Sequence, residues 1–175
     1  VPFFGLNPFI TQMKQTGMIH NVIVTNDNGT ILLSAYWDGS TPTERGKFEH
    51  DLYLQTRPEW IEIKPPKDDV DKYDQFKPHV SLVNNKCVVY QKANDVVFFI
   101  TGSGEYTELI LSEILTVIMN GFVAMCPKKQ LWCREFANDN TFGKMVAMLD
   151  QIIYMGQYCQ SDIVVADGRA KMKSI

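Results

Sequence analysis

The sequence predicts an α+β domain in which helices flank a five-stranded, antiparallel-type sheet, with the element order β-β-α-β-β-β-α-α. Short runs of β-branched and aromatic residues, separated by turn-forming residues, predict one group of two strands and one group of three. A helix-capping sequence lies between the two groups, and two longer apolar segments follow the last strand. The helices and the sheet are therefore expected to share one core.

The composition favours a single folded domain. The chain has 175 residues, of which 45% are hydrophobic and 21% charged, and its formal net charge is −3. A chain of this size buries about 70% of its surface on folding, which is enough for a core of its own. The hydrophobic content excludes intrinsic disorder. A nucleic-acid partner is not expected, because DNA or RNA binding needs clustered excess cations.

The first two strands are predicted over residues 18–26 and 31–37, on either side of Asn26-Asp27-Asn28-Gly29. The Asn-Gly pair favours the positive φ angles of a tight hairpin. The same turn resembles part of a calcium loop, but no ligand set with a terminal Glu follows at the required spacing. Turn chemistry accounts for these residues, and no metal site is predicted.

The first helix is predicted to begin at Thr41-Pro42-Thr43-Glu44, a capping box with proline at the first helical position. Phe48 and Leu52, four residues apart, form one apolar face, and the helix is expected to end near Gln55.

Residues 57–78 are predicted to form an inserted, Pro-rich and charged loop, because four prolines forbid a long regular element. Three strands are predicted after the loop, over residues 79–83, 87–91 and 96–101. The short, turn-forming spacers between these strands favour antiparallel neighbours.

A long apolar helix is predicted over residues 104–126 and ends before Pro127. Residues 109–126 reach the minimum length of a membrane span, but Glu113 and Asn120 interrupt them. A helix buried on almost all sides inside a soluble assembly fits better.

A final helix is predicted from the capping residues 138–141 to a stop at Gly156, and the chain after Gly156 is expected to be extended or mobile. The predicted domain spans 18–159, between an N-terminal extension, 1–17, and a C-terminal tail, 160–175. The apolar stripe of the final helix consists of Phe142, Met145, Val146, Leu149, Ile152 and Ile153.

No catalytic site and no cofactor are predicted. Gly102-Ser103-Gly104 has the position of a phosphate cradle between strand and helix, but no Gly-Lys-Ser/Thr follows it. Glu105 and Glu108 would repel an anion there. No nucleophile elbow and no metalloprotease motif occurs, and the three histidines, His20, His50 and His79, are scattered along the chain.

The cysteines also lack a pattern that indicates chemistry. None forms a C-x-x-C pair, so a zinc site is not expected, and reduced thiols are the simplest interpretation. An enzyme with a hidden cysteine or histidine site is the disfavoured alternative. The four cysteines are Cys87, Cys126, Cys133 and Cys159.

The 104–126 helix has more apolar surface than one sheet face covers. Two interpretations remain open: a protein partner covers the surplus, or a second helix does so inside a thick core.

The series of elements resembles the zeta subunits of the COPI coatomer, which are related to the longin-like small subunits of the clathrin adaptor complexes and of the TSET complex. The resemblance spans about residues 18–159 and depends on the order and spacing of several short segments. These segments are Asn26-Asp27-Asn28-Gly29, Lys47-Phe48-Glu49 with Leu52, Val88-Val89-Tyr90-Gln91-Lys92, Phe98-Phe99-Ile100-Thr101-Gly102-Ser103, Glu108-Leu109-Ile110-Leu111 and Leu149-Asp150-Gln151-Ile152-Ile153.

The resemblance implies a longin-like (SNARE-like) fold and a non-catalytic role in a vesicle coat. A zeta subunit is held by the N-terminal α-solenoid trunk of the gamma-coatomer subunit, in a heterotetramer with the beta and delta subunits. An Arf GTPase recruits the coat to the cytoplasmic face of Golgi membranes for intra-Golgi and Golgi-to-ER transport, so membrane association would be peripheral and indirect. On this basis the partner-binding residues are expected to be Ile114, Val117, Ile118, Phe122, Phe48 and Leu52.

Two alternatives stay open. One is a sigma-type small subunit of a clathrin adaptor or TSET-like complex, which helps bind cargo sorting signals. The other is a longin domain that regulates tethering or fusion. A longin SNARE would continue into a heptad-repeat helix, whereas only a short tail follows the predicted domain here.

Overall fold

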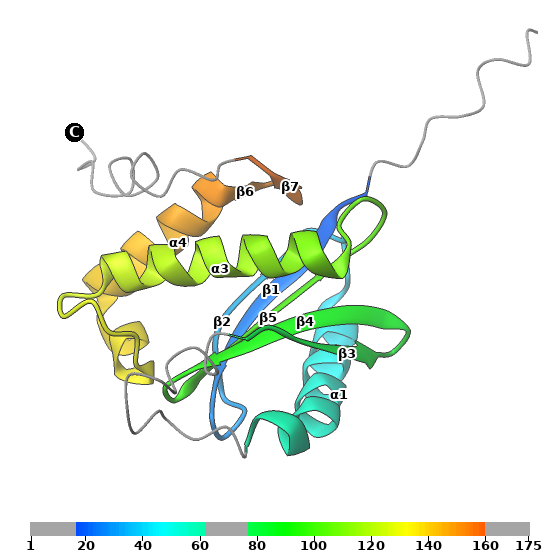
Figure 1. Cartoon of the computed structure of the whole chain (residues 1–175), viewed down its shortest axis with the longest axis horizontal. Coiled ribbons are helices and arrows are strands. Elements are labelled where there is room, and N and C mark those ends of the chain that lie inside the picture. The colour runs from blue at the N-terminus through cyan, green and yellow to red at the C-terminus, as the bar shows by residue number, and fades with distance from the viewer. Residues whose placement is uncertain (1–16, 62–76, 160–175) are drawn as a thin grey trace, which may run out of the picture.

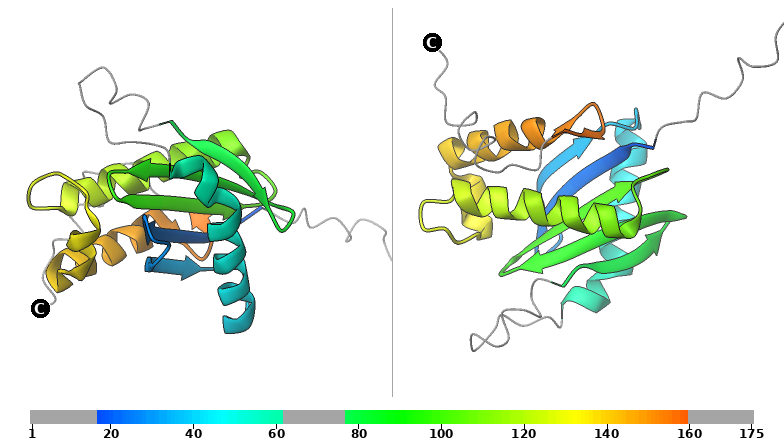
Figure 2. Two further views of the ribbon diagram at one scale, coloured as in Figure 1. Left: turned by 90° about the horizontal axis from the view of Figure 1, so that it is seen from below. Right: turned by 45° about the horizontal axis from the view of Figure 1, so that its top comes forward.

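The computed structural model describes residues 17–61 and 77–159, which form a five-stranded antiparallel sheet covered by helices on both faces (Figure 1). The helix α1 (Pro42–Trp60) covers one face. The helices α3 (Glu108–Met125) and α4 (Asp139–Ile152) lie side by side over the other face (Figure 2). The α+β class and the order β-β-α-β-β-β-α-α are confirmed.

The sheet has the strand order β2-β1-β5-β4-β3. The two predicted groups therefore meet where β1, the first strand of the first group, pairs with β5, the last strand of the second group. All neighbouring strands are antiparallel. The inner strands are covered on both faces and therefore have continuous apolar runs instead of alternating ones. The bounds are Ile19–Asn26 for β1, Ile31–Tyr36 for β2, His79–Val83 for β3, Lys86–Ala93 for β4 and Val96–Gly102 for β5.

The predicted β1–β2 hairpin is present. The Asn26 Oδ1 atom accepts hydrogen bonds from the backbone amides of Asn28 and Thr30, at 3.0 and 2.9 Å. Gly29 has a φ of +79°, and the ring of Tyr53 packs so closely that a Cβ atom at residue 29 would be 2.4 Å from it. The turn sequence thus fixes both the hairpin and its contact with α1.

The helix α1 begins at the predicted capping box but extends beyond its predicted end. Thr41 and Glu44 form both hydrogen bonds of the box. The helix continues past Gln55 to Trp60, because Trp60 is fully buried and donates a hydrogen bond of 3.1 Å from Nε1 to Thr56 Oγ1. Burial of this indole offsets the cost of Pro58 in the last turns of the helix.

The helix α3 begins at Glu108, four residues later than predicted. Gly104 has a φ of +69°, so the chain turns there, and Thr107 is still extended. Glu105 is therefore outside the helix, where its carboxylate accepts a hydrogen bond of 2.6 Å from the Gly17 amide.

Two short elements near the C-terminal end were not predicted. A 3₁₀ helix, η2 (Cys133–Ala137), precedes α4, and a hairpin of β6 (Ile153–Tyr154) and β7 (Gln157–Tyr158) follows it. The backbone carbonyl of Gly156 accepts a hydrogen bond of 2.8 Å from the Ile19 amide. Gly156 is thus tied to β1, and residues 157–158 pair with β6, so this part of the chain is extended but held in a hairpin and not mobile.

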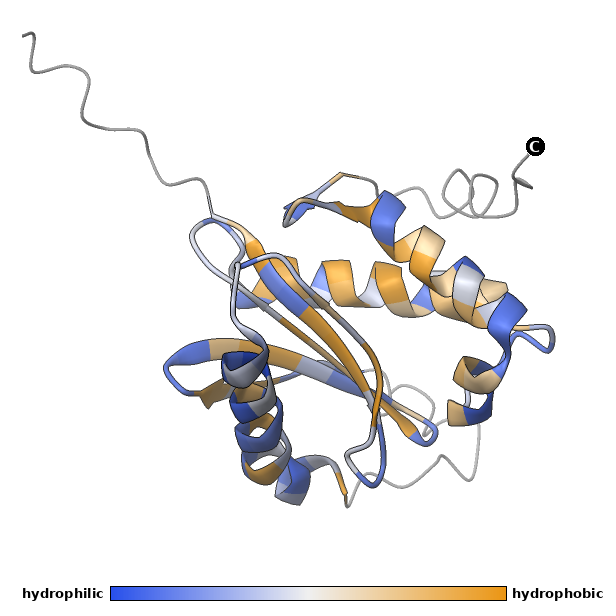
Figure 3. Cartoon of the chain, turned by 180° about the vertical axis from the view of Figure 1, so that it is seen from behind, coloured by the Kyte–Doolittle hydropathy of each residue, from blue (hydrophilic) through white to orange (hydrophobic). Residues whose placement is uncertain are grey.

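Each face of the sheet has its own core. The larger core lies under α3 and α4, and the smaller one, which includes Phe48, Leu52 and Trp60, lies under α1. Figure 3 shows the difference, because the central strands and α3 are mostly hydrophobic whereas α1 is mostly hydrophilic. The sheet and α4 bury eight of the 18 residues of α3, so the helix is less enclosed than the expected burial on almost all sides.

Three predicted segments lie outside the described residues. They are the N-terminal extension 1–17 except Gly17, the 62–76 part of the 57–78 loop, and the C-terminal tail 160–175.

Candidate partner-binding surface

Five of the six residues predicted to bind a partner lie in the cores of the chain itself. Ile114, Ile118 and Phe122 face the sheet from α3, whereas Phe48 and Leu52 face it from α1; all five side chains are buried. Val117, on α3, is the sixth and is half-buried. The five buried residues form two groups on opposite faces of the sheet. Because Val117 is only half-buried, it is the residue among the six that a partner could contact most readily.

The outward side of α3 retains apolar residues despite this burial. Leu109 is 70% exposed, and Ile110 next to it is partly exposed. By length and composition α3 could cross a membrane, but eight of its residues are buried against the sheet and α4. It therefore packs as the core helix of a folded domain.

A second set of exposed apolar residues lies on the edge strand β3. Val80 and Leu82 are 53% and 65% exposed, and their register partners are Val89 and Cys87 of β4. Cross-strand partners share a face, and Val89 belongs to the core under α3, so Val80 and Leu82 lie on the α3 side of the sheet.

The two sets meet at one corner of the molecule. The Cys87 Sγ atom, opposite Leu82, lies 3.6 Å from Glu108 Oε1, and Glu108 directly precedes Leu109. We call Val80, Leu82, Leu109 and Ile110 the β3–α3 corner. Because β3 is an edge strand, this corner offers a partner apolar side chains together with unpaired backbone groups.

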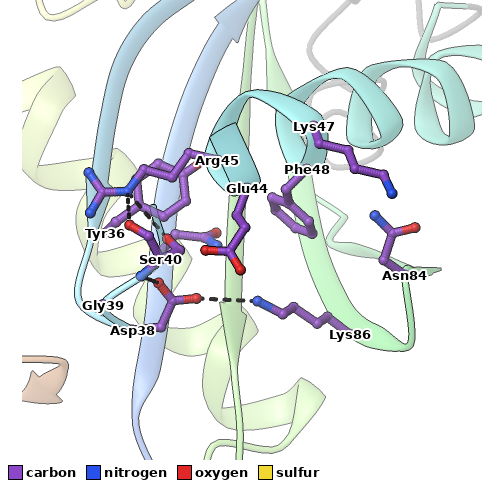
Figure 4. Close-up of a pocket in the computed structure, with 11 residues that line it drawn as sticks. Tyr36, Asp38, Gly39, Ser40, Glu44, Arg45, Lys47, Phe48, Asn84 and Lys86 are labelled. Carbon is purple, nitrogen blue, oxygen red and sulfur yellow. Dashed lines mark hydrogen bonds and ion pairs between the residues drawn. The ribbon is translucent and has the colours of Figure 1, made fainter. Parts of the chain in front are cut away.

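The opposite face holds a pocket of about 540 Å³ at the N-terminal end of α1 (Figure 4). Asp38 and Ser40 contribute from the segment after β2, Glu44 and Arg45 from α1, and Lys86 from the start of β4. Its lining has two acidic side chains, those of Asp38 and Glu44, and three basic ones, because Lys47 of α1 also lines it. We call it the α1 pocket.

One ion pair spans the α1 pocket. Lys86 reaches across the pocket to Asp38, with 3.2 Å between Nζ and Oδ2 (Figure 4). Burial alone would raise the pKa of Asp38, but the hydrogen bonds from Ser40 and the charge of Lys86 hold that pKa below its usual range. The Glu44 carboxylate is engaged by the Thr41 cap. With Asp38 and Glu44 against Arg45, Lys47 and Lys86, the lining carries both signs of charge and a formal excess of one positive charge.

Tyr36 closes one side of the same pocket. Its hydroxyl donates a hydrogen bond of 2.9 Å to Glu49 Oε1, and the Arg45 guanidinium lies over its ring at 4.7 Å. Burial and the bond to Glu49 raise the pKa of Tyr36, so this hydroxyl stays protonated at neutral pH.

Two buried polar side chains were missed at the sequence level. Asn21 of β1 lines the α1 pocket and is fully buried, and its register partner on β5 is Thr101, which is fully buried too. Within the described residues, Asn21 Nδ2, Asn21 Oδ1 and Thr101 Oγ1 have no hydrogen-bond partner. The sequence did contain a sign of the first one: the carboxamide of Asn21 lies between the apolar residues Ile19 and Val22, where no turn explains it.

The thiols give no sign of nucleophilic chemistry. Burial raises the pKa of Cys87 and raises that of Cys126 to about 11, whereas a hydrogen bond with Asp95 is the main cause of the raised pKa of Cys133. A catalytic thiolate requires the opposite shift. Among residues 17–61 and 77–159, no group of three or more His, Cys, Asp or Glu side chains is placed to hold a metal ion.

Comparison with known proteins gives matches along nearly the whole chain. The chain is 26% identical to "TSET complex member tstD" of Dictyostelium discoideum, over 89% of this chain and 94% of that protein. It is 25% identical to "Coatomer subunit zeta-1" of Arabidopsis thaliana, over 93% of this chain and 84% of that protein. "Coatomer subunit zeta-2" of the same plant is 22% identical, with 90% and 80% covered. No family model matches the chain.

The fold also matches a known structure. A chain in a homology model of the full-length AP-3 complex, in a stretched open conformation, superposes with a TM-score of 0.56. The match covers 87% of this chain and 91% of that chain at 13% identity, so it concerns the fold alone. It confirms the longin-like fold that was predicted from the order of elements.

Proposed function

We propose that this chain, a member of the family of coatomer zeta and adaptor small subunits, is a non-catalytic small subunit of a heterotetrameric vesicle coat complex. The main support is the extent of the similarity, since the match with tstD covers 94% of that protein and 89% of this chain. A match of this extent leaves only about a tenth of this chain outside the alignment. The relatives thus support a role as a subunit of a coat complex. Which complex the chain belongs to is the further part of the proposal.

We propose the TSET-like assignment first. The TSET member matches with slightly higher identity, 26% against 25% for zeta-1 and 22% for zeta-2, and more of its length is covered, 94% against 84% and 80%. A TSET-like or sigma-type subunit would sit in the trunk of a large subunit and help to bind cargo sorting signals.

The zeta-type assignment is the second candidate, supported by the zeta-1 match, which covers 93% of this chain. In that case the chain would stabilise the α-solenoid trunk of gamma-coatomer in a subcomplex with beta and delta subunits. It would reach Golgi membranes and COPI vesicles through the coat and, indirectly, through an Arf GTPase. Under either assignment the chain is cytoplasmic and meets the membrane peripherally.

We propose that the large subunit contacts the β3–α3 corner and the half-buried Val117. Leu82 and Leu109 are 65% and 70% exposed, and apolar side chains that project this far are typical of surfaces that a protein partner covers. Of the remaining predicted residues, Ile114, Ile118 and Phe122 would support the α3 side from beneath, whereas Phe48 and Leu52 lie in the core on the other face of the sheet.

Affinity purification of the tagged full chain from its own cells, followed by mass spectrometry of stable partners, tests the proposal. Large subunits of a TSET-like complex would support the first assignment, gamma-coatomer the second, and an adaptin a sigma-type subunit. Co-expression with the large subunit that is found should raise the soluble yield of the chain. A stable monomer that binds no large subunit would contradict the proposal.

A further inference from the structure

We propose that the α1 pocket binds a peptide group from an extended segment of a partner protein, and that Asn21 is the residue that recognises it. The inference rests on the proposed function, because it names a contact between this chain and the large subunit. It depends on the buried carboxamide of Asn21, on the size of the pocket and on the charge balance around it.

Asn21 has unused hydrogen-bonding capacity of both kinds. Its side chain is fully buried, and within the described residues neither Nδ2 nor Oδ1 has a partner. A carboxamide presents donors on the nitrogen and an acceptor on the oxygen. Because a buried polar group without a partner is costly, natural structures rarely keep one. A ligand that offers one acceptor and one donor would satisfy both atoms, and a peptide group does so.

Thr101 lies next to Asn21 in the sheet, although it does not line the pocket itself. It is the register partner of Asn21 across β1 and β5, it is fully buried, and its hydroxyl has no partner in the described part of the chain. Two adjacent strands thus place an amide and a hydroxyl side by side on the α1 side of the sheet, where the surrounding core is otherwise apolar.

The charges around the pocket are of both signs, which suits a polar but uncharged group. The Lys86 ammonium is paired with Asp38, and the Glu44 carboxylate is engaged by Thr41. An anion would meet the carboxylates of Asp38 and Glu44, whereas a cation would meet Arg45, Lys47 and Lys86. A peptide group has no net charge, and a pocket of about 540 Å³ has room for a short extended segment.

The Lys86–Asp38 ion pair bridges the pocket and would have to open for a ligand to reach the floor (Figure 4). The Lys86 side chain is 37% exposed and that of Asp38 is 14% exposed, so the ammonium end of the pair is in contact with solvent. When the pair opens, water can solvate the Lys86 ammonium, and new hydrogen bonds to Asn21 offset the loss of the pair.

The first test needs no partner protein. The full chain, labelled with ¹⁵N, is titrated with N-acetylglycine N-methylamide, which presents peptide groups, and separately with sodium acetate. The proposal expects saturable shifts of the Asn21 side-chain amide signals with the peptide analogue and none with acetate. No saturable shift with the analogue, as expected if water alone fills the pocket, would overturn the proposal.

The second test uses two variants and the large subunit found by affinity purification. Asn21→Leu removes the carboxamide, and Thr25→Val is the matched control, since Thr25 is a buried β1 residue with an unpartnered hydroxyl in the described structure but does not line the pocket. Asn21→Leu should weaken binding about tenfold or more, whereas Thr25→Val should leave it unchanged.

Thermal unfolding of the free chain separates binding from folding. Because each substitution removes a buried polar group without a partner, both variants should unfold at or above the wild-type temperature. Wild-type affinity in Asn21→Leu would overturn the peptide site and leave the proposed function intact. If the wild-type chain bound no large subunit, the proposed function would fail, and the titration would still decide whether the pocket accepts a peptide group.

Discussion

Gly121 of α3 lies directly against Met148 of α4, so closely that a Cβ atom on residue 121 would be 2.2 Å from the Met148 sulfur. Both residues are buried where the two helices cross. Gly121→Ala would gain up to about 1 kcal/mol in helix propensity, but the buried methionine would have to move, which costs about 1–3 kcal/mol. We expect a net destabilisation of about 1 kcal/mol, measured by urea unfolding.

Gly143 provides the matched control for this prediction. It lies in α4, and a Cβ atom there would meet nothing within 4 Å. Gly143→Ala should therefore stabilise the domain by about 0.5–1 kcal/mol. Opposite signs for the two substitutions would identify the close approach of α3 and α4, whereas equal stabilisation would contradict it.

The capping box of α1 gives a second prediction. The Thr41 side chain accepts from the Glu44 amide, and Glu44 bonds back to the Thr41 amide at 2.8 Å. Thr41→Ala should lower the free energy of unfolding by about 1 kcal/mol. Thr107 is at the N-cap of α3 but makes no capping hydrogen bond, so Thr107→Ala should have little effect. Similar losses in both variants, measured by chemical denaturation, would argue against a specific role for the box.

The pH dependence of stability gives a third prediction, centred on His20. Burial, followed by the charge of Lys86, lowers the pKa of His20 below its ordinary value of 6.5, although Asp38 opposes this shift. The unfolded chain therefore binds a proton at a pH where the folded chain does not. The contribution of neutral His20 to the free energy of unfolding is fully present above about pH 6.5. It is lost as the pH falls towards the pKa of His20 in the folded chain.

Urea unfolding between about pH 8 and about pH 5 should show this loss in the wild-type chain and a smaller loss in His20→Gln. His50 is exposed on α1, so His50→Gln is the control and should keep the wild-type slope. An unchanged slope in His20→Gln would show that other groups cause the pH dependence.

Local signals explain why most of the fold was predictable. The capping residues Thr41 and Glu44, and Asn26 and Gly29 in the hairpin turn, act within a few residues of the elements that they define. The end of α1 could not be found in this way, because burial of Trp60 under Lys92 of β4 depends on contacts distant in the sequence. The β6–β7 hairpin is tied to β1 in the same long-range manner.

The candidate site was less predictable for a related reason. An apolar residue of a helix is equally suited to a core and to an interface, and only the packing of α4 and the sheet distinguishes Ile114 from Leu109. Asn21 is the converse case, a polar residue whose lack of partners becomes visible only once its neighbours are known.

The fourth prediction tests where the predicted α3 residues act. Ile114 is 1% exposed, so Ile114→Ala should destabilise the domain by about 2–5 kcal/mol through cavity formation. Val117 is half-buried on the same helix, and Val117→Ala should cost distinctly less. Urea unfolding of both variants shows which of them loses so much stability that weaker partner binding would reflect lost structure and not a lost contact. Equal costs would mean that Val117 is as much a core residue as Ile114.

The last prediction tests the β3–α3 corner as the surface that the large subunit covers. Leu82→Glu and Leu109→Glu change side chains that are 65% and 70% exposed, so the free chain should keep its unfolding temperature. If the partner covers these positions, a buried unpaired charge should weaken binding about tenfold or more. Leu54 is 56% exposed on α1, outside both this corner and the lining of the α1 pocket, and Leu54→Glu adds the same charge there as a control. Binding of the co-purified large subunit, measured by titration calorimetry, should fall for the first two variants alone. Wild-type affinity for both, or an equal loss for Leu54→Glu, would place the large subunit elsewhere.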